Sequence, residues 1–289
     1  MRSISFKKFQ MDLQSVAQST KFQPHELETT LANLVVVQLI NQSFSGFQAT
    51  GFLKGGTGMQ VRFGLRAGRA TRDVDISLGL SAQEIMQGLV DMVGQTWELF
   101  GIKHVALVAT ANPRDIPEHE KILKFKIQVL YGNTFWRSVN LEVSVHDSHP
   151  ELDHEPVRVS SEIVGILQAL DLSVLSQVRI ISPELQLAQK LHALSSPNAN
   201  RGRDIYDINV LIRQHLPKLE LLARLCHETF IYRNKFPWVG FVRDEEPLRE
   251  PYAEAIDGII GAPTFEEALA DVEALMKLVE PHVFRIQAA

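Results

Sequence analysis

The sequence contains a single cysteine, Cys226, in 289 residues, and this scarcity bears on where the protein works. One thiol forms no disulfide within the chain, so no covalent link substitutes for a hydrophobic core. Proteins without disulfides are typical of reducing compartments, and we expect a cytoplasmic location. Hydrophobic residues make up 45% of the chain, which is an ordinary globular composition and sufficient for a sizeable core.

Long hydrophobic runs and a basic excess are also missing. The N-terminal segment carries no apolar stretch behind its charges, so we expect no signal peptide. The run LVVVQLI at 34–40 is too short to cross a bilayer, and we expect no membrane partner. Acidic residues outnumber basic ones, 34 to 29, which argues against a uniformly basic protein that coats nucleic acid. A local basic patch remains compatible with that balance.

Residues 52–78, FLKGGTGMQVRFGLRAGRATRDVDISL, contain the first candidate site. Gly55 and Gly56 follow a short predicted strand and let backbone amides approach an anion closely. Thr57 adds a hydroxyl at the predicted start of a helix, where anions are favoured. The segment has neither the Gly-Lys-Ser/Thr of a Walker loop nor a G-x-G-x-x-G pattern. A tight strand-to-helix turn without a ligand is the structural alternative.

Asp73 and Asp75 lie in RDVDISL, which alternates polar and apolar residues with the period of a strand. Alternation places both carboxylates on one face, where they repel each other. A hard divalent cation such as Mg²⁺ binds through one or two carboxylates together with substrate phosphates. The pattern is therefore consistent with a metal site, and equally with a solvated strand edge.

Two further alternating runs, 124–131 and 138–146, predict an antiparallel hairpin. In the second run Asn140, Glu142, Ser144 and His146 share one face, and the apolar residues share the other. Glu142 is therefore a candidate third metal ligand, or a base that takes a proton from a hydroxyl nucleophile. The alternative is a solvated outer face of the hairpin.

Five basic residues lie around the first candidate site: Lys54, Arg62, Arg66, Arg69 and Arg72. Such a patch suits a triphosphate or an RNA backbone. It suits equally well the neutralisation of the carboxylates, or an ordinary solvated face.

The order of the predicted elements indicates two domains. The N-terminal half is mixed α/β with a small, partly antiparallel sheet, and the C-terminal half is mostly helical. The polar, proline-bearing segment at 146–158 is the best candidate for their boundary. We therefore expect domains at 1–155 and 156–289.

The opening motif resembles that of the nucleotidyltransferase superfamily that includes DNA polymerase β, in which a Gly-Gly or Gly-Ser turn leads through a short helix to an Asp-X-Asp strand. Within it, the chain is more similar to the AbiEii/AbiGii toxin family. That family pairs Leu-Lys-Gly-Gly-Thr with a later helical lysine and an Arg-Asp-X-Tyr-Asp segment. Here these are LKGGT at 53–57, Lys190 in ELQLAQKLHAL, and RDIYD at 203–207. Gly58, Thr71 and Arg72 depart from the usual pattern without removing a catalytic group.

The resemblance implies a metal-dependent enzyme, using Mg²⁺ or Mn²⁺, that transfers NMP from an NTP to an acceptor hydroxyl. Asp73, Asp75 and Glu142 are the implied metal ligands. Lys54, Gly55, Gly56 and Thr57 are the implied nucleotide contacts of the first motif. The implied acceptor is RNA, plausibly the 3′ end of tRNA, and the implied partner is a cognate antitoxin.

The second motif has its own physical interpretation. Leu187, Leu191 and Leu194 fall at helical spacing and should face a core, with Lys190 beside them. Lys190 then either contacts phosphate as a point charge or extends to the surface. The resemblance favours a catalytic or nucleotide-binding role for Lys190, a nucleotide contact for Arg203, and a functional carboxylate at Asp204 or Asp207.

Two other functions remain possible from the sequence. One is a small-molecule nucleotidyltransferase of the aminoglycoside-modifying type, which an acidic C-terminal pocket would favour. The other is a binding module without catalysis, which the clustered carboxylates argue against.

Overall fold

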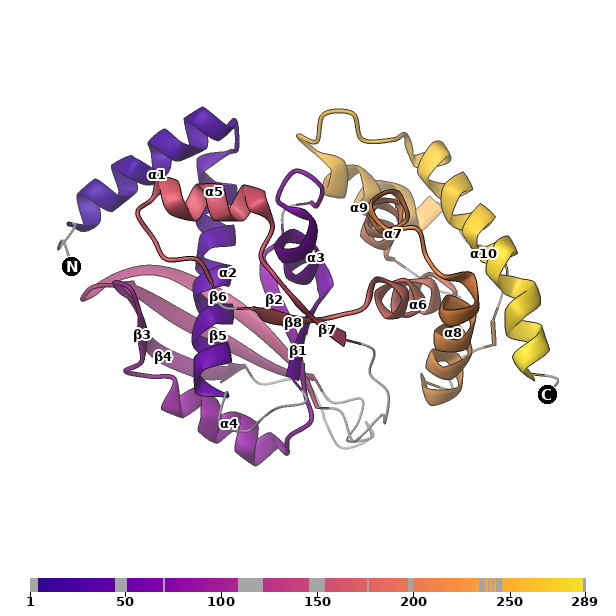
Figure 1. Ribbon diagram of the computed structural model, residues 1–289, viewed down its shortest axis with the longest axis horizontal. Helices are drawn as coiled ribbons and strands as arrows, with labels where there is room; N and C mark the ends of the chain where they lie inside the picture. Colours follow the sequence, from indigo (N-terminus) through magenta and orange to yellow (C-terminus); the bar gives the residue numbers. More distant parts are fainter. Residues whose placement is uncertain are drawn as a thin grey trace. The chain divides into compact units, whose positions relative to one another are not determined.

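The structure is a computed structural model that describes residues 5–44, 51–69, 71–108, 122–145, 154–175, 177–196, 200–233, 237–238, 240, 242 and 246–287 (Figure 1). Its internal contacts divide the chain into two units. Met1–Leu65 and Ala70–Ile180 form the first unit, and Arg66–Arg69 and Ile181–Ala289 form the second. A short segment between two elements of the first unit therefore belongs to the second.

The first unit is built on an eight-stranded mixed sheet with the strand order β3-β4-β5-β6-β2-β1-β8-β7. The central pair β2–β6 is parallel, and the neighbouring pairs β1–β2 and β5–β6 are antiparallel. The strands are β1 (Gly51–Lys54), β2 (Asp73–Leu78), β3 (Thr96–Trp97), β4 (Phe100–Val108), β5 (Ile122–Tyr131), β6 (Thr134–Val145), β7 (His154–Val157) and β8 (Val178–Ile181).

The two faces of this sheet differ in polarity because apolar and polar residues alternate along β2, β5 and β6. Val74, Ile127 and Val143 are fully buried on one face. Lys124, Lys126 and Asn140 alternate with buried residues and are exposed. The predicted hairpin is confirmed as β5–β6, although β6 begins earlier than expected, at Thr134.

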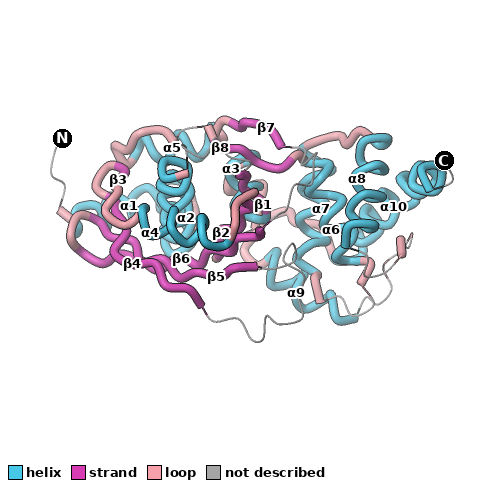
Figure 2. Tube along the Cα trace, turned by 90° about the horizontal axis from the view of Figure 1, so that it is seen from below, coloured by secondary structure: helices cyan, strands magenta, loops and turns pink. Residues whose placement is uncertain are grey.

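Helices cover the apolar face. Figure 2 shows α1, α2 and α4 together on one side of β4, β5 and β6. Phe9 of α1 stacks on Tyr131 of β5 with ring centroids 4.4 Å apart, and Arg137 of β6 pairs with Glu28 of α2 at 2.7 Å. The helices of this unit are α1 (Phe6–Thr20), α2 (Pro24–Ser43), α3 (Gly55–Phe63), α4 (Ala82–Asp91) and α5 (Ser161–Ala169).

The described elements of the second unit are helical apart from the end of β8. They are α6 (Pro183–Leu194), α7 (Gly202–Gln214), α8 (Leu219–Arg233), α9 (Glu246–Ile256) and α10 (Phe265–Gln287). Leu187, Leu191 and Leu194 are fully buried, which confirms the apolar stripe expected on α6. Within the described residues, no helix combines the length and apolar character that a membrane crossing requires.

The mixed α/β fold followed by a mostly helical part is confirmed. The expected domain boundary after residue 155 stays a prediction. The contact-based units keep β7, α5 and most of β8 with the sheet, because β8 runs parallel to β1 with Ile180 opposite Leu53. Most of the polar segment at 146–158 lies outside the described residues.

Candidate active site

Three predicted carboxylates gather on the polar face of β2 and β6. Asp73 and Asp75 are half-buried, whereas Val74 between them is fully buried on the other face. Glu142 lies directly opposite Asp75 in the parallel pairing. The Nδ2 of Asn140 donates a hydrogen bond of 2.9 Å to Oδ1 of Asp73, which fixes one oxygen of that carboxylate. The sequence places Asn140 on the face of Glu142 but predicts no role for it.

The glycine turn brings backbone against one of these carboxylates. Gly55 has φ +63°, in the left-handed region that glycine adopts without strain. A Cβ on Gly55 would lie 2.1 Å from Oδ2 of Asp75, so any other residue here would require the Asp75 carboxylate to shift. Helix α3 begins at Gly55, and the first amides of a helix have no intrahelical acceptor and favour an anion. The turn therefore presents a partly positive helix end beside an acidic strand.

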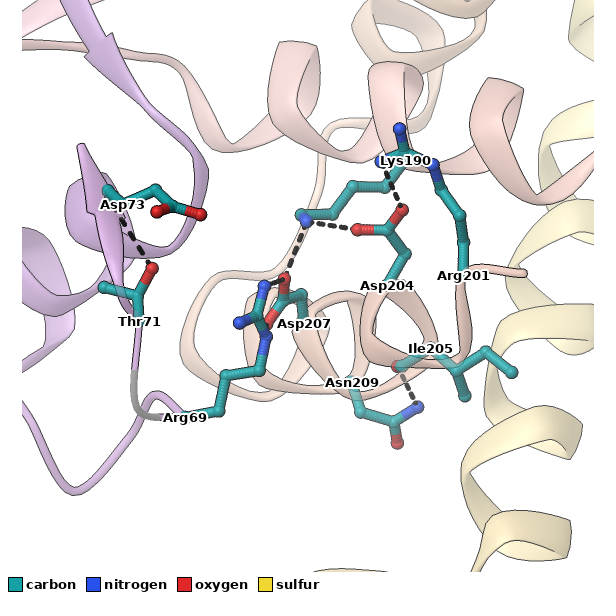
Figure 3. A network of polar contacts seen from close by, with 9 residues as sticks. All are labelled: Arg69, Thr71, Asp73, Lys190, Arg201, Asp204, Ile205, Asp207 and Asn209. Carbon is teal, nitrogen blue, oxygen red and sulfur yellow. Dashed lines mark hydrogen bonds and ion pairs between the residues drawn. The ribbon is translucent and has the colours of Figure 1, made fainter. Parts of the chain in front are cut away.

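Thr57 has a structural contact that the sequence does not predict. Its side chain is buried, and Oγ1 donates to the carbonyl oxygen of Asp73 at 2.9 Å. Thr71 donates a longer bond, 3.4 Å, to the same carbonyl (Figure 3). Both hydroxyls therefore hold the first residue of β2 in place.

Two lysines flank the carboxylates along one row of the sheet. In register across β5, β6, β2 and β1, the row reads Lys124, Glu142, Asp75, Lys54. Lys124 Nζ donates to Glu142 at 2.5 Å, and Lys54 Nζ donates to Ser144 at 2.6 Å. The hydrogen bond to Glu142, together with its charge, raises the pKa of Lys124. Cations thus sit at both ends of a pair of adjacent acids.

The carboxylates of Asp73 and Asp75 are of the chemical type that a divalent cation binds. Among the described residues, no group of three or more His, Cys, Asp and Glu side chains is arranged to hold a metal ion. Glu142 is already engaged by Lys124. Mg²⁺ typically needs only one or two protein carboxylates when phosphates supply the other ligands. The oxygen donors of Asp73 and Asp75 therefore fit such an ion, with Glu142 as a neighbouring acid.

A second cluster of charges lies within the second unit, between α6 and α7 (Figure 3). Lys190 Nζ donates to Oδ1 of Asp204 and to Oδ2 of Asp207, both at 2.7 Å. All three residues are buried, and Asp207 is only 1% exposed. The structure therefore joins Lys190 to both candidate aspartates.

Arg69 completes this cluster, although the sequence does not predict its partner. Its Nε and one terminal nitrogen donate to the two oxygens of Asp207 at 3.1 and 3.2 Å, which is a bidentate pair. Arg69 is the last residue of the segment Arg66–Arg69, which belongs to the second unit. The sequence offers neutralisation of the carboxylates of the first candidate site as one role for the arginine-rich segment. Arg69 instead pairs with Asp207, an acid outside that site.

The charges of this cluster support one another. Burial disfavours the charged form of Lys190, but the carboxylates of Asp204 and Asp207 outweigh burial and raise its pKa. Burial also disfavours ionised Asp207, but Lys190 and Arg69 outweigh it and lower the pKa of that carboxyl. We therefore treat Lys190 as a cation and Asp207 as an anion at neutral pH.

Arg203 lies apart from the cluster. Its guanidinium pairs with Glu254 at 2.8 Å on the surface, where both side chains are more than half exposed. The neighbouring Gly202 is required by packing, because a Cβ there would lie 1.9 Å from the carbonyl oxygen of Leu248 in α9. The start of α7 thus lies directly against α9, which fixes the position of Asp204 and Asp207.

Comparison with known proteins identifies a related family. A family model described as the nucleotidyl transferase AbiEii toxin of a type IV toxin–antitoxin system matches residues 38–277. The solved structure of MenT4, a nucleotidyltransferase toxin from Mycobacterium tuberculosis H37Rv, is similar with a TM-score of 0.55 at 15% sequence identity. That alignment covers 92% of this chain and 98% of MenT4, and it shows a shared fold.

A second solved structure resembles the chain less. The antibiotic-resistance factor ANT(2'')-Ia matches with a TM-score of 0.40 at 13% identity, over 71% of this chain and 94% of that protein. No curated protein sequence matches the chain.

Proposed function

Because the chain belongs to the nucleotidyl transferase AbiEii toxin family of type IV toxin–antitoxin systems, we propose that it transfers NMP from an NTP to a hydroxyl group of an RNA acceptor. Nucleotidyl transfer is the activity class of the family. The 3′ end of tRNA is the proposed acceptor. The observation that carries the proposal is the approach of Gly55 to Asp75, which joins a helix N-terminus to a carboxylate pair.

The first unit is proposed to hold the triphosphate. The amides at Gly55 and Gly56 begin α3 and suit phosphate oxygens, and Lys54 adds a cation beside them. Asp73 and Asp75 would hold Mg²⁺ or Mn²⁺. When bound, this ion neutralises phosphate charge and orients the oxygens for in-line displacement. Asn140 keeps the Asp73 carboxylate oriented through its hydrogen bond.

Glu142 is proposed to receive the proton of the acceptor hydroxyl. It lies opposite Asp75 on the same face, and its hydrogen bond to Lys124 holds its carboxylate in one orientation. The acceptor oxygen forms a bond to the α-phosphorus as the bond to pyrophosphate breaks. The hydroxyl proton passes to the Glu142 carboxylate and then to water.

Lys190 is the proposed phosphate contact of the second unit. An ammonium group has three N–H donors, and among the described residues Asp204 and Asp207 accept two of them. The third N–H is available for a phosphate oxygen. Asp204 and Asp207 are proposed to position Lys190, with Arg69 balancing the charge of Asp207. Arg203, which is exposed, stays a proposed nucleotide contact. Measuring NTP binding by an Arg203→Ala variant tests this role.

A cognate antitoxin is the partner that the family implies. Its direct binding to this chain is a proposal. We also propose a cytoplasmic location, because the one cysteine is a buried free thiol and the chain carries no disulfide.

The test is transfer of label from each α-labelled NTP to total tRNA in the presence of Mg²⁺. Asp75→Asn should lower transfer at least about 100-fold, since it weakens the carboxylate pair. Asp257→Asn is the matched control, because Asp257 is exposed and far from β2 in the chain. Label on tRNA with the parent and the control supports the proposal.

Other results would redirect it. Label on an aminoglycoside and on no RNA would indicate a small-molecule transferase. Equal activity of Asp75→Asn and the parent would remove Asp75 from the catalytic site. Absence of NTP binding and of transfer would indicate a non-catalytic binding protein.

A further inference from the structure

The polar face of the sheet continues well beyond the carboxylates. Lys126 of β5 lies opposite Asn140 of β6, which lies opposite Asp73 of β2, so these three residues form a second row beside that of Lys124. Strands in a sheet are about 4.8 Å apart, so the lysine backbone lies roughly 10 Å from that of the aspartates. Lys124 and Lys126 therefore lie one strand beyond Glu142 and two strands beyond the aspartates.

Both lysines are accessible. Lys124 is 47% exposed in its side chain even though it pairs with Glu142. Lys126 is exposed, and no side-chain partner is found for it among the described residues. The face is thus acidic at β2 and β6 and basic at β5.

An exposed aromatic ring lies on the same face. The regular alternation of β5 places Leu130 on the side of Lys124 and Lys126, and Phe135 of β6 lies opposite Leu130 after a register shift. Phe135 is 49% exposed, and no ring contact is found for it among the described residues. Leu130 is four residues from Lys126, or about 13 Å along an extended strand.

We propose that this face, which we call the β5 face (Lys124, Lys126 and Phe135), binds the acceptor as a single strand of RNA that leads to the carboxylates. Lysines contact the phosphates of such a strand, and an exposed ring stacks on an unpaired base. The β5 face itself does not distinguish RNA from DNA, so the choice of RNA rests on the proposed function.

The charges of the β5 face favour this occupant over a small cation. Lys124 and Lys126 repel a cationic drug that approaches the carboxylates from β5, and they attract a phosphodiester chain. Lysines beside an accessible ring suit single-stranded nucleic acid, because its bases are unstacked and free to pack on an aromatic side chain.

The experiment measures binding of the full chain to a fluorescent single-stranded RNA, without NTP, over a series of salt concentrations. Lys126→Glu should weaken binding about tenfold and lower the slope of log K against log salt by about 0.7, the loss of one phosphate contact. Phe135→Ala should weaken binding about tenfold with the slope unchanged, since stacking releases no counterion.

Lys7→Glu is the matched control. Lys7 is exposed on α1, which packs on the opposite face of the same sheet, and its substitution makes the same charge change. Thermal melting of each variant checks that the fold is retained. Equal weakening by Lys126→Glu and Lys7→Glu, or no weakening by Lys126→Glu and Phe135→Ala, would overturn the inference. Equally tight binding of duplex RNA would also overturn it.

Failure of this inference is distinguishable from failure of the proposed function. If the parent labels RNA but the β5-face variants bind RNA as the parent does, the transferase stands and the surface is refuted. If the parent binds RNA through Lys126 and Phe135 but transfers no nucleotide, the surface stands and the transferase proposal is refuted.

Discussion

Replacing Gly55 by alanine, compared with the same change at Gly132, should separate the cost of backbone strain from the effect of displacing the Asp75 carboxylate, a proposed metal ligand. Gly55 has φ +63°, and an alanine held in that conformation costs about 1–2 kcal/mol in the free energy of unfolding. The added Cβ would also lie 2.1 Å from Oδ2 of Asp75. To restore an acceptable contact, the carboxylate must move by about 1 Å, and misplacement on that scale costs roughly 100-fold in rate.

Gly132 provides the control for the strain. It has φ +57°, and a Cβ there would meet nothing within 4 Å. Gly132→Ala should therefore lose the same 1–2 kcal/mol, a fall of about 2–8 °C in Tm for a unit of this size, with transfer activity retained.

The assays are urea unfolding for stability and NTP-to-tRNA label transfer for activity, measured on both variants. Equal loss of stability with a roughly 100-fold difference in transfer is the expected result. If Gly55→Ala and Gly132→Ala transfer label at the same rate, the Asp75 carboxylate has no positional role and the reasoning fails.

Two further predictions concern the second unit, and the second of them has its control in α5 of the first unit. Asp207→Asn should lower the free energy of unfolding at pH 7 by about 3 kcal/mol, because it breaks a buried ion pair with Lys190 and Arg69. The folded pKa of Asp207 is lowered, so its stabilisation is present above the unfolded pKa of about 3.9 and is lost as pH falls through the folded value. Urea unfolding from pH 7 to pH 2 should therefore show the parent losing more stability than the variant, and parallel curves would contradict this. Gly202→Ala should destabilise by about 1–3 kcal/mol, since its Cβ meets the Leu248 carbonyl, whereas Gly165→Ala in α5 should stabilise by up to about 1 kcal/mol, because its Cβ meets nothing. A thermal melt compares the two, and a stabilised Gly202→Ala would show that α7 and α9 are less closely packed than described.

Local sequence patterns predict on which face of the strand Asp73 and Asp75 lie. The alternation in RDVDISL is sufficient to place Asp73 and Asp75 on one face, because strand geometry depends only on neighbouring residues. The glycine turn is also predicted, but the close approach of Gly55 to Asp75 is not, and the proposed approach of its amides to an anion stays a prediction. The pairing of Asp75 with Glu142 is not local, since β2 and β6 are joined through three other strands. Alternation predicts the face of Glu142, but it does not predict the partner strand.

Contacts between distant residues account for what the sequence does not predict. Four arginines lie between α3 and β2 or at their ends, and no local feature distinguishes Arg69 from the others. Its partner Asp207 is 138 residues away. Gly202 is likewise uninformative in sequence, because the backbone of α9 that excludes a side chain there lies in another helix. Arg203 follows the family pattern but pairs with Glu254 on the surface.

The assignment of Arg66–Arg69 to the second unit has a consequence for how the protein can be divided. The chain enters that unit at Arg66, leaves it after Arg69, and enters it again at Ile181. A fragment that begins at Ile181 would leave Asp207 without its guanidinium partner, and the complementary fragment would keep an arginine without its acid. Recombination that exchanged only the C-terminal helices would meet the same difficulty. A division of the chain at Ile181 therefore separates Arg69 from Asp207, although both residues belong to the second unit.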